Sequence, residues 1–245
     1  MLYNKKITIQ YLGTKFAGWQ IQAKGRTVQE EIQKALTKMY KTKINIIGSG
    51  RTDSGVHALG QTASYRTEIF LPADAVHKGL NSILPNDISI ISVEDVPEDF
   101  HAQISAKSKT YQFRIYASRD RSAMHADRTW WVKANLDYKD IERYLKVFEG
   151  EHDFSSFCVQ TSLKDNNIRT INSTKCFMEG DIICVEINGN GFLHNMVRII
   201  VGTIVDAIKK GYSVEHLTNV LNAKDRNEAG PTAHAMGLYL KEVFY

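Results

Sequence analysis

Residues 48–60, GSGRTDSGVHALG, decide how this chain is interpreted, because they place Asp53 beside Arg51 in a run too rich in glycine for a buried core. The isoleucines just upstream predict a short strand, and residues 61–65 resume an extended pattern. We therefore predict a loop held between two strands, which is a rigid mount for a reactive carboxylate on Asp53. The simpler alternative is a β-turn over residues 52–55 in which Asp53 caps its own backbone.

Outward from this loop, the first part of the chain alternates between strand and helix patterns. A capping box of Thr27 and Glu30 starts the first helix, and Pro85 follows the end of the second. We predict strands at residues 7–11, 44–47, 61–65 and 88–93, and helices over 28–39 and 73–83. The resulting order is βαββαβ.

The second part of the chain repeats this alternation. We predict strands at residues 111–115 and 238–244, a hairpin over 168–188 that turns at 179–181, and helices from Asp137 to a stop at Gly150, from about Phe192, and after Ser213. These patterns predict an α+β fold of two ferredoxin-like βαββαβ-type halves, residues 1–103 and 104–245. We expect their antiparallel sheets to merge around a central basic cleft, with the Asp53 loop on the first half.

Composition excludes several classes of protein. The chain has 245 residues, of which 43% are hydrophobic, so it is long enough to bury a large core. No apolar run approaches the roughly 18 residues of a membrane span, and the N-terminus lacks a signal-peptide pattern, so we expect a cytoplasmic protein without membrane contact. The three cysteines, Cys158, Cys176 and Cys184, lack metal-binding spacing and predict buried, reduced thiols. We expect no structural metal.

The net charge of +4 is unevenly distributed. Residues 1–26 and 105–128 together carry +9, which leaves −5 for the remainder. A local excess of this kind is what a phosphate-binding surface requires, and it favours a nucleic-acid partner. The alternative is a pair of solvated strand faces.

Several motifs together resemble one family. The string GRTDSGVHA is similar to the signature of the tRNA pseudouridine synthase A family. Further matches to that family occur in the same order at residues 16–20, 100–102, 107–111, 150–157, 191–202 and 237–238. The resemblance implies an isomerase that converts uridine to pseudouridine at positions 38–40, in the anticodon stem-loop of tRNA. It also implies a homodimer, and the reaction demands no cofactor.

The same resemblance implies roles for individual residues. Asp53 is expected to be the catalytic nucleophile, paired with Arg198. We expect substrate-binding roles for Tyr111, Arg51 and Leu238, and RNA-binding roles for Lys107, Lys109 and Trp19. Lys109 stands where the family commonly has an arginine, so it cannot form a bidentate phosphate clamp.

Three of these residues have a simpler structural alternative. On a helical wheel, Arg198 lies about 140° from Leu193, at the border of an apolar face, where its side chain can extend into solvent. Tyr111 shares a strand face with Phe113 and fits a half-buried core position. Trp19 fits a packing anchor. Two other functions also remain open: a non-catalytic tRNA-binding or folding module that uses the same basic cleft, and a carboxylate-nucleophile hydrolase unrelated to RNA.

Overall fold

The computed structural model describes residues 2–245, which divide by their contacts into two compact units. The first contains the residues up to Lys107 together with Tyr239–Tyr245, and the second contains Ser108–Leu238. The predicted boundary after residue 103 lies four residues before this division, inside the first unit, and it stays a prediction for the extent of independent domains. The last strand, which we assigned to the second half, is grouped by its contacts with the first unit.

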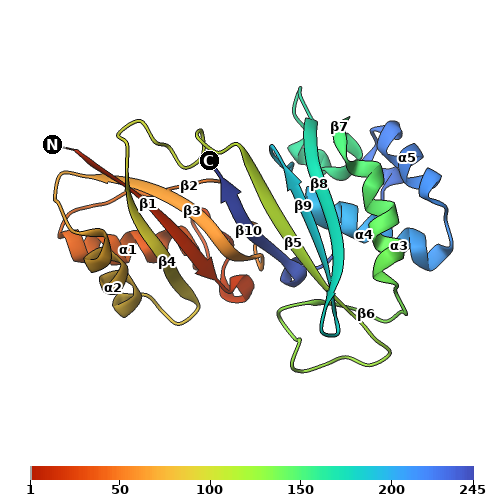
Figure 1. The fold of residues 1–245 in the computed structure, drawn as a ribbon, viewed down its shortest axis with the longest axis horizontal. Coiled ribbons are helices and arrows are strands. Elements are labelled where there is room, and N and C mark those ends of the chain that lie inside the picture. The colour runs from red at the N-terminus through yellow and green to blue at the C-terminus, as the bar shows by residue number, and fades with distance from the viewer. Residues whose placement is uncertain (1) are drawn as a thin grey trace. The chain divides into compact units, whose positions relative to one another are not determined.

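The first unit is built on a βαββαβ sequence of elements, as predicted (Figure 1). They are β1 (Tyr3–Tyr11), α1 (Val28–Tyr40), β2 (Ile47–Gly48), β3 (His57–Thr67), α2 (Ala73–Ile83) and β4 (Ile88–Val96), with a 3₁₀ turn, η1, at Gly13–Lys15. Strand β1 lies between β4 and β3 and is antiparallel to both. The short β2 and the last strand, β10 (Leu238–Phe244), both pair with β3, and β10 runs parallel to it.

The core of this unit follows the sequence patterns that predict it. Thr27 caps α1 by accepting a hydrogen bond from the Glu30 N–H at 3.4 Å. The apolar stripe of α1, including Ile32 and Leu36, is fully buried, and so are Ile7 and Ile9 of β1. Helices α1 and α2 contact each other beside the strands, so the unit has one layer of helices on its sheet (Figure 1).

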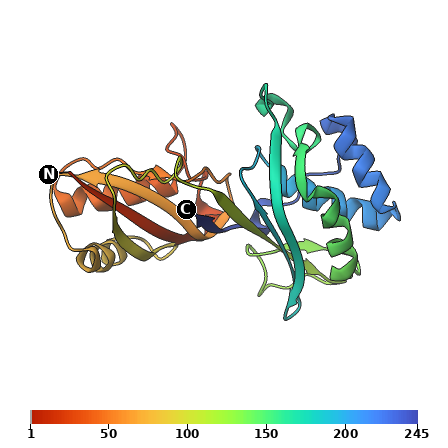
Figure 2. The same ribbon diagram turned by 45° about the horizontal axis from the view of Figure 1, so that its top comes forward.

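The second unit contains a four-strand antiparallel sheet in the order β5-β9-β8-β7, with β6 parallel to β5. Its strands are β5 (Ser108–Ala117), β6 (Trp130–Val132), β7 (Gly150–Asp153), β8 (Ile168–Glu179) and β9 (Ile182–Gly189). Its helices are α3 (Tyr138–Leu145), α4 (Met196–Lys210) and α5 (Val214–Ala223), which gather on the same side of the β8–β9 hairpin (Figure 2). Further 3₁₀ turns lie at Lys146–Phe148, Ser155–Phe157, Gln160–Ser162, Arg226–Glu228 and Ala235–Gly237.

The ten strands are mostly antiparallel and five helices accompany them, which confirms the α+β prediction. Asp137 caps α3 as expected, and the β8–β9 hairpin turns at Gly180 and Asp181. The basic cleft expected between the halves stays a prediction.

Two local predictions were wrong in extent, and two short strands were not predicted. Residues 44–46 are not a strand, because α1 side chains satisfy their backbone: the Ile46 N–H donates to Gln33 Oε1 and the Ile44 N–H to Thr37 Oγ1. Helix α4 begins at Met196 instead of near Phe192, because Asn195 adopts a left-handed conformation with φ of 62° and interrupts the helical geometry. The short strands β6 and β7 were not predicted, since neither has a periodic apolar pattern.

All three cysteines are buried and free, which confirms the prediction of reduced thiols. Burial raises the pKa of Cys176 and of Cys184 to about 12, so both thiols stay protonated at neutral pH. Within residues 2–245, no group of three or more His, Cys, Asp or Glu side chains is placed to hold a metal ion. In the same part of the chain, no helix has the length and apolarity needed to cross a membrane.

Candidate active site

Asp53 lies in the loop that the sequence predicted, between β2 and β3, and its side chain is partly exposed. The Val56 N–H donates to the Asp53 carbonyl at 3.1 Å and closes a turn over residues 53–56. Gly55, the third residue of this turn, has a φ of 79°, a value that suits glycine and is typical of a type II turn. The predicted β-turn is therefore present, but it covers residues 53–56 instead of 52–55. Asp53 opens the turn, so a turn and a reactive carboxylate are compatible here.

Thr52 fixes the loop through two hydrogen bonds. Its hydroxyl and the Tyr11 hydroxyl are 2.7 Å apart in a buried hydrogen bond, and its carbonyl accepts from the Trp19 N–H at 3.0 Å. Burial raises the pKa of the Tyr11 phenol well above its ordinary value, although the bonds to Thr52 and Gln61 act in the opposite direction. The phenol therefore stays protonated and remains a constant partner for the residue that precedes Asp53.

Gln61 supports the start of the loop. Its Oε1 accepts from the Ser49 hydroxyl at 2.8 Å, while its Nε2 donates to the Gly50 carbonyl at 3.0 Å. Both Ser49 and Gln61 are fully buried. One amide side chain therefore binds two neighbouring loop residues through its two ends, which fixes its orientation as well as the loop's.

Gly13 and His57 close the other side of the loop. A Cβ atom on Gly13 would lie 1.9 Å from the Val56 carbonyl oxygen, so only glycine allows this approach. The Gly13 N–H donates to Nδ1 of His57 at 3.0 Å, and the fully buried His57 ring stacks on Tyr239 with centroids 4.6 Å apart. These contacts place η1, the loop and β10 against one another and agree with the predicted loop held between two strands. Its role as the mount of a reactive carboxylate stays a prediction.

Trp19 lies beneath this loop and is 1% exposed. A Cβ atom on Gly48 would come within 2.6 Å of its indole ring, and the Trp19 carbonyl accepts from the Gln29 N–H at 3.1 Å. This placement agrees with the packing-anchor alternative, and an RNA contact by Trp19 stays a prediction. Arg51, two residues before Asp53, is exposed and can reach solvent ions.

In the second unit, Tyr111 lies on β5 and is 9% exposed. Its ring meets the ring of Phe192 edge-on, with centroids 4.9 Å apart and an interplanar angle of 80°. Phe113, two residues along, is completely buried on the same face of the strand. The arrangement fixes the orientation of the Tyr111 ring, and a substrate role for it stays a prediction.

Arg198 lies in the first turn of α4 and is partly buried. Its Nε donates to the Ala233 carbonyl at 2.8 Å and its Nη1 donates to Asn195 Oδ1 at 2.7 Å. Two bonds of this kind fix the plane of a guanidinium group. The snorkelling alternative therefore does not describe Arg198, because the side chain is held by protein acceptors.

The remaining predicted residues lie in different environments. Lys107 is exposed and Lys109 is partly buried, and burial lowers the pKa of the Lys109 ammonium below its ordinary value. Lys109 lies opposite Gly189 in the β5–β9 register. Leu238, the first residue of β10, is buried. RNA-binding and substrate-binding roles for these three residues stay predictions.

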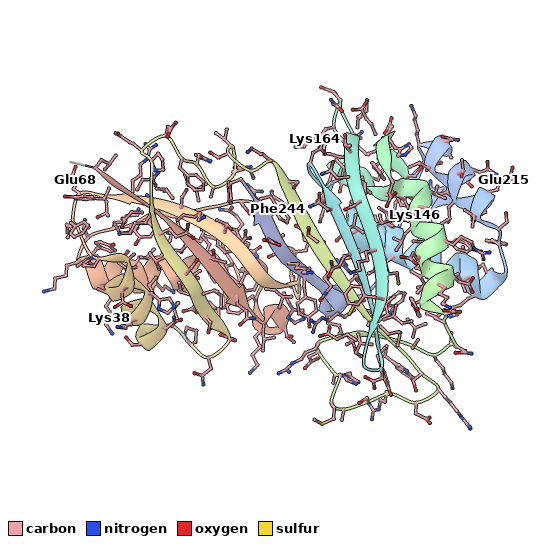
Figure 3. All side chains as sticks on the ribbon, viewed as in Figure 1. Lys38, Glu68, Lys146, Lys164, Glu215 and Phe244 are labelled. Atoms are coloured by element: carbon pink, nitrogen blue, oxygen red, sulfur yellow. The ribbon has the colours of Figure 1, made fainter. Side chains whose placement is uncertain are left out.

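The charge analysis of residues 1–26 needs correction. The Lys5 ammonium is completely buried and lies 2.5 Å from an Asp95 carboxylate oxygen, and Lys6 lies 2.9 Å from Glu94. Arg26 binds Asp87 through two nitrogens and Glu31 through a third. Each of these three cations has an acidic partner within residues 87–95, far along the chain, so the three do not form a phosphate-binding surface. In the tract 105–128, Arg119, Arg121 and Arg128 are exposed in the loop between β5 and β6, whose side chains extend outward from the ribbon in Figure 3.

Sequence patterns did not single out several residues that support this geometry. Gln61, Asn195 and Ala233 hold the predicted functional residues or their backbone. His57, which belongs to the Asp53 motif, is expected from the sequence to order the loop by hydrogen bonding, and its bond from the Gly13 N–H agrees with that expectation. The others act through contacts that no local pattern encodes.

Comparison with known proteins matches the chain to a family described as tRNA pseudouridine synthase. The match covers residues 7–104 and 145–245, including the Asp53 loop and Arg198. Residues 105–144, with Tyr111, Lys107 and Lys109, lie outside the matched ranges.

Curated relatives cover nearly the whole chain. A tRNA pseudouridine synthase A of Brachyspira hyodysenteriae is 44% identical over 244 residues, which span 99% of this chain and 98% of the relative. Proteins of the same description from Ruminiclostridium cellulolyticum and Acetivibrio thermocellus are 40% and 41% identical, over 98% and 99% of this chain and of each relative. A crystal structure of a Cbf5-Nop10-Gar1 complex overlaps 96% of this chain and 57% of its own chain, with 10% identity and a TM-score of 0.39. From the family match and these relatives, we conclude that the chain belongs to the tRNA pseudouridine synthase A family, whose members are isomerases.

Proposed function

We propose that the chain isomerises uridine to pseudouridine at positions 38–40 in the anticodon stem-loop of tRNA, with Asp53 as the nucleophile. Membership of the family supports tRNA pseudouridine synthesis as the activity, in preference to an RNA-binding module or a hydrolase. One observation carries the assignment of Asp53: its carboxylate is partly exposed at the head of a turn whose backbone is fixed on both sides. A reactive group needs this combination of access and fixed position.

The reaction rearranges bonds within one nucleotide. The N1–C1′ bond breaks, the uracil rotates, and a C5–C1′ bond forms, while the proton on C5 is lost and N1 gains one. Asp53 acts either by bonding to C1′ or by removing the C2′ proton to give a glycal. Substrate and product have the same composition, so the chemistry needs no oxidant, reductant or group donor.

Residues of both units complete the proposal. Arg198 is proposed to hold the Asp53 carboxylate in its ionised form, which its fixed guanidinium plane suits. Tyr111 is proposed to stack on the uracil, and Leu238 to contact the same nucleotide. Lys107, Lys109 and Arg51 would bind RNA phosphates. From the family resemblance, we further propose a cytoplasmic homodimer.

Asp53→Asn tests the central assignment. We expect the variant to release no tritium from tRNA labelled at uridine C5, while its tRNA affinity stays within about tenfold of wild type, because the amide keeps the size of the side chain and loses its nucleophilicity. Asp74→Asn is the matched control, since Asp74 is exposed on α2 and pairs with Lys78. It should turn over like wild type. Measurable tritium release by Asp53→Asn would remove Asp53 from the chemistry.

A pair of variants tests Tyr111 separately. If the hydroxyl contributes to the reaction, Tyr111→Phe should melt normally and bind tRNA, yet react slowly in a single turnover. If Tyr111 is a packing residue alone, Tyr111→Phe should react at the full rate, and Tyr111→Ala should lose about 3–5 kcal/mol of stability. Thermal melting and single-turnover tritium release distinguish the two outcomes.

A further inference from the structure

Two cavities of the second unit are lined in part by β6 or by the residues that follow it. The first, which we call the Arg119 cavity, has a volume of about 320 Å³ and is lined by Ser118, Arg119, Lys133 and Asn135, among others. The second, the Lys209 cavity, has a volume of about 220 Å³, and its lining includes Trp130, Trp131, Lys133 and Lys209. Lys133 lines both, so the two cavities are neighbours along one surface.

Trp131 lines one of these cavities and is hydrogen-bonded to a residue that lines the other. Its side chain is 41% exposed, which is unusual for so large an apolar ring. Its indole N–H donates to the carbonyl of Ser118 at 3.1 Å, and Ser118 lines the Arg119 cavity, while the ring itself lines the Lys209 cavity. The hydrogen bond and the pairing of Trp131 with Tyr116 of β5 fix the ring in position. The exposed face of the ring is therefore already held in one orientation. Binding to it costs less side-chain entropy than binding to a mobile ring would.

Three cations line the two cavities. Arg119, Lys133 and Lys209 are all exposed. Asp206 is an acid in the lining of the Lys209 cavity, and its carboxylate is occupied by Lys210 at 2.8 Å. The Arg119 cavity is at the lower end of the range of about 300–1,000 Å³ that is typical of drug-sized ligands, and the Lys209 cavity is below it. Each therefore fits a single small group, and their net charge favours an anion.

We propose that this surface binds an unpaired nucleotide of the tRNA, whose base stacks on Trp131 while its flanking phosphates enter the Arg119 and Lys209 cavities. Aromatic faces that alternate with cations are how proteins bind single-stranded nucleic acid, because every base has a face that can stack and every nucleotide carries a phosphate. The surface is additional to the residues proposed for catalysis. It rests on tRNA as the substrate and is independent of the role of Asp53.

Variants of Trp131 test the stacking contact. Trp131→Leu removes the aromatic face and keeps an apolar side chain, and it should weaken equilibrium binding of the tRNA by about 5- to 150-fold. Trp131→Phe keeps a ring and should weaken binding by less. Phe70→Leu is the control, because Phe70 is an aromatic residue of the other unit with 55% exposure, and it should bind tRNA like wild type. Melting temperatures establish that each variant is folded.

Salt dependence tests the binding of phosphates. Lys133→Gln should flatten the slope of log affinity against log salt by about 0.7–0.9 for each phosphate that the variant no longer binds. An unchanged affinity for Trp131→Leu, or an unchanged slope for Lys133→Gln, would overturn the proposal. Light scattering supplies a third outcome: if Trp131→Leu alters the oligomeric state and leaves RNA affinity unchanged, the surface binds protein and the proposal fails. Tritium release by Asp53→Asn would overturn the nucleophile assignment without affecting any of these binding results.

Discussion

The loop around Asp53 and the loop between β5 and β6 differ in how they are hydrogen-bonded to the rest of the protein. Residues 49–56 are bonded to β1, to β3 and to the segment after β1, largely through buried groups. Residues 118–129 are fixed at their base, where His125 lies 3.1 Å from Asp181 and accepts from Thr129 through its carbonyl. The rest of that loop presents exposed arginines. Bond-making chemistry requires a backbone held to within fractions of an ångström, whereas a phosphate contact requires only a long cation within reach.

Among the variants that test this comparison, Gly13→Ala should have the largest effect on stability and turnover. The new Cβ would overlap the Val56 carbonyl at 1.9 Å, and neither backbone can yield without moving the Asp53 turn. We expect a loss of about 3 kcal/mol or more in the free energy of unfolding, at the upper end for overpacking, together with a large fall in turnover. Denaturant unfolding and tritium release measure the two effects.

Gly79→Ala is the control for Gly13→Ala. Its Cβ meets the flexible end of Met39, 2.6 Å away, and alanine is favoured over glycine inside a helix such as α2. It should leave stability and turnover almost unchanged. Normal turnover in Gly13→Ala would mean that the loop does not need its close approach to η1.

Alkaline pH should reveal the buried phenol beneath the fixed loop. Burial raises the pKa of Tyr11 above its ordinary value of 10.0, so the folded protein keeps this proton at pH values where the unfolded chain releases it. Stability should therefore fall as the pH rises above about 10, by about 1.4 kcal/mol per pH unit from Tyr11. Tyr11→Phe should lower stability at neutral pH by about 0.5–1.5 kcal/mol, because the bond to Thr52 is removed, and should show a shallower alkaline decline. Equal alkaline slopes for the two proteins would contradict this account.

Substitutions in the loop between β5 and β6 should have the smallest effect on stability. Arg119→Gln combined with Arg121→Gln should change the free energy of unfolding by no more than about 0.5 kcal/mol, because both side chains are exposed. The same change should reduce the salt dependence of tRNA binding. Lys34→Gln with Lys38→Gln, on the exposed face of α1, serves as the control. A large loss of stability in the arginine variant would show that the two loops are more alike than their hydrogen bonds indicate.

The sequence predicted those parts of the fold whose signals are local. Thr27 and Asp137 cap helices through neighbouring N–H groups, and a two-residue turn at Gly180 closes the β8–β9 hairpin. Residues 44–46 escaped prediction because their backbone is satisfied by side chains of α1, which no window of a few residues contains. The start of α4 was misplaced because a left-handed asparagine interrupts an otherwise continuous apolar pattern.

The same difference between local and long-range signals applies to the candidate site. Asp53 could be identified because its motif is contiguous. The partners that fix its loop, Tyr11 with Thr52 and Gly13 with His57, are separated by more than 40 positions. Counting charges failed for Lys5 for a similar reason, since the composition of a tract does not reveal that Asp95 lies beside it on β4. Sequence patterns located the Asp53 loop, and long-range contacts determine how firmly it is held.

The pairing of β10 with β3 determines when, during translation, the first unit can be completed. Tyr239 lies opposite His57, and the Phe244 carbonyl accepts from the Lys107 N–H, so the first unit is finished only after the whole second unit has been translated. A ribosome that adds about 5–20 residues per second needs roughly 7–26 s to make the intervening Ser108–Leu238. During that interval the nascent chain carries the Asp53 motif without the tyrosine that stacks on its histidine. A message truncated before the codon of Tyr239 would therefore yield a protein that contains the Asp53 motif but lacks one of the contacts that hold it.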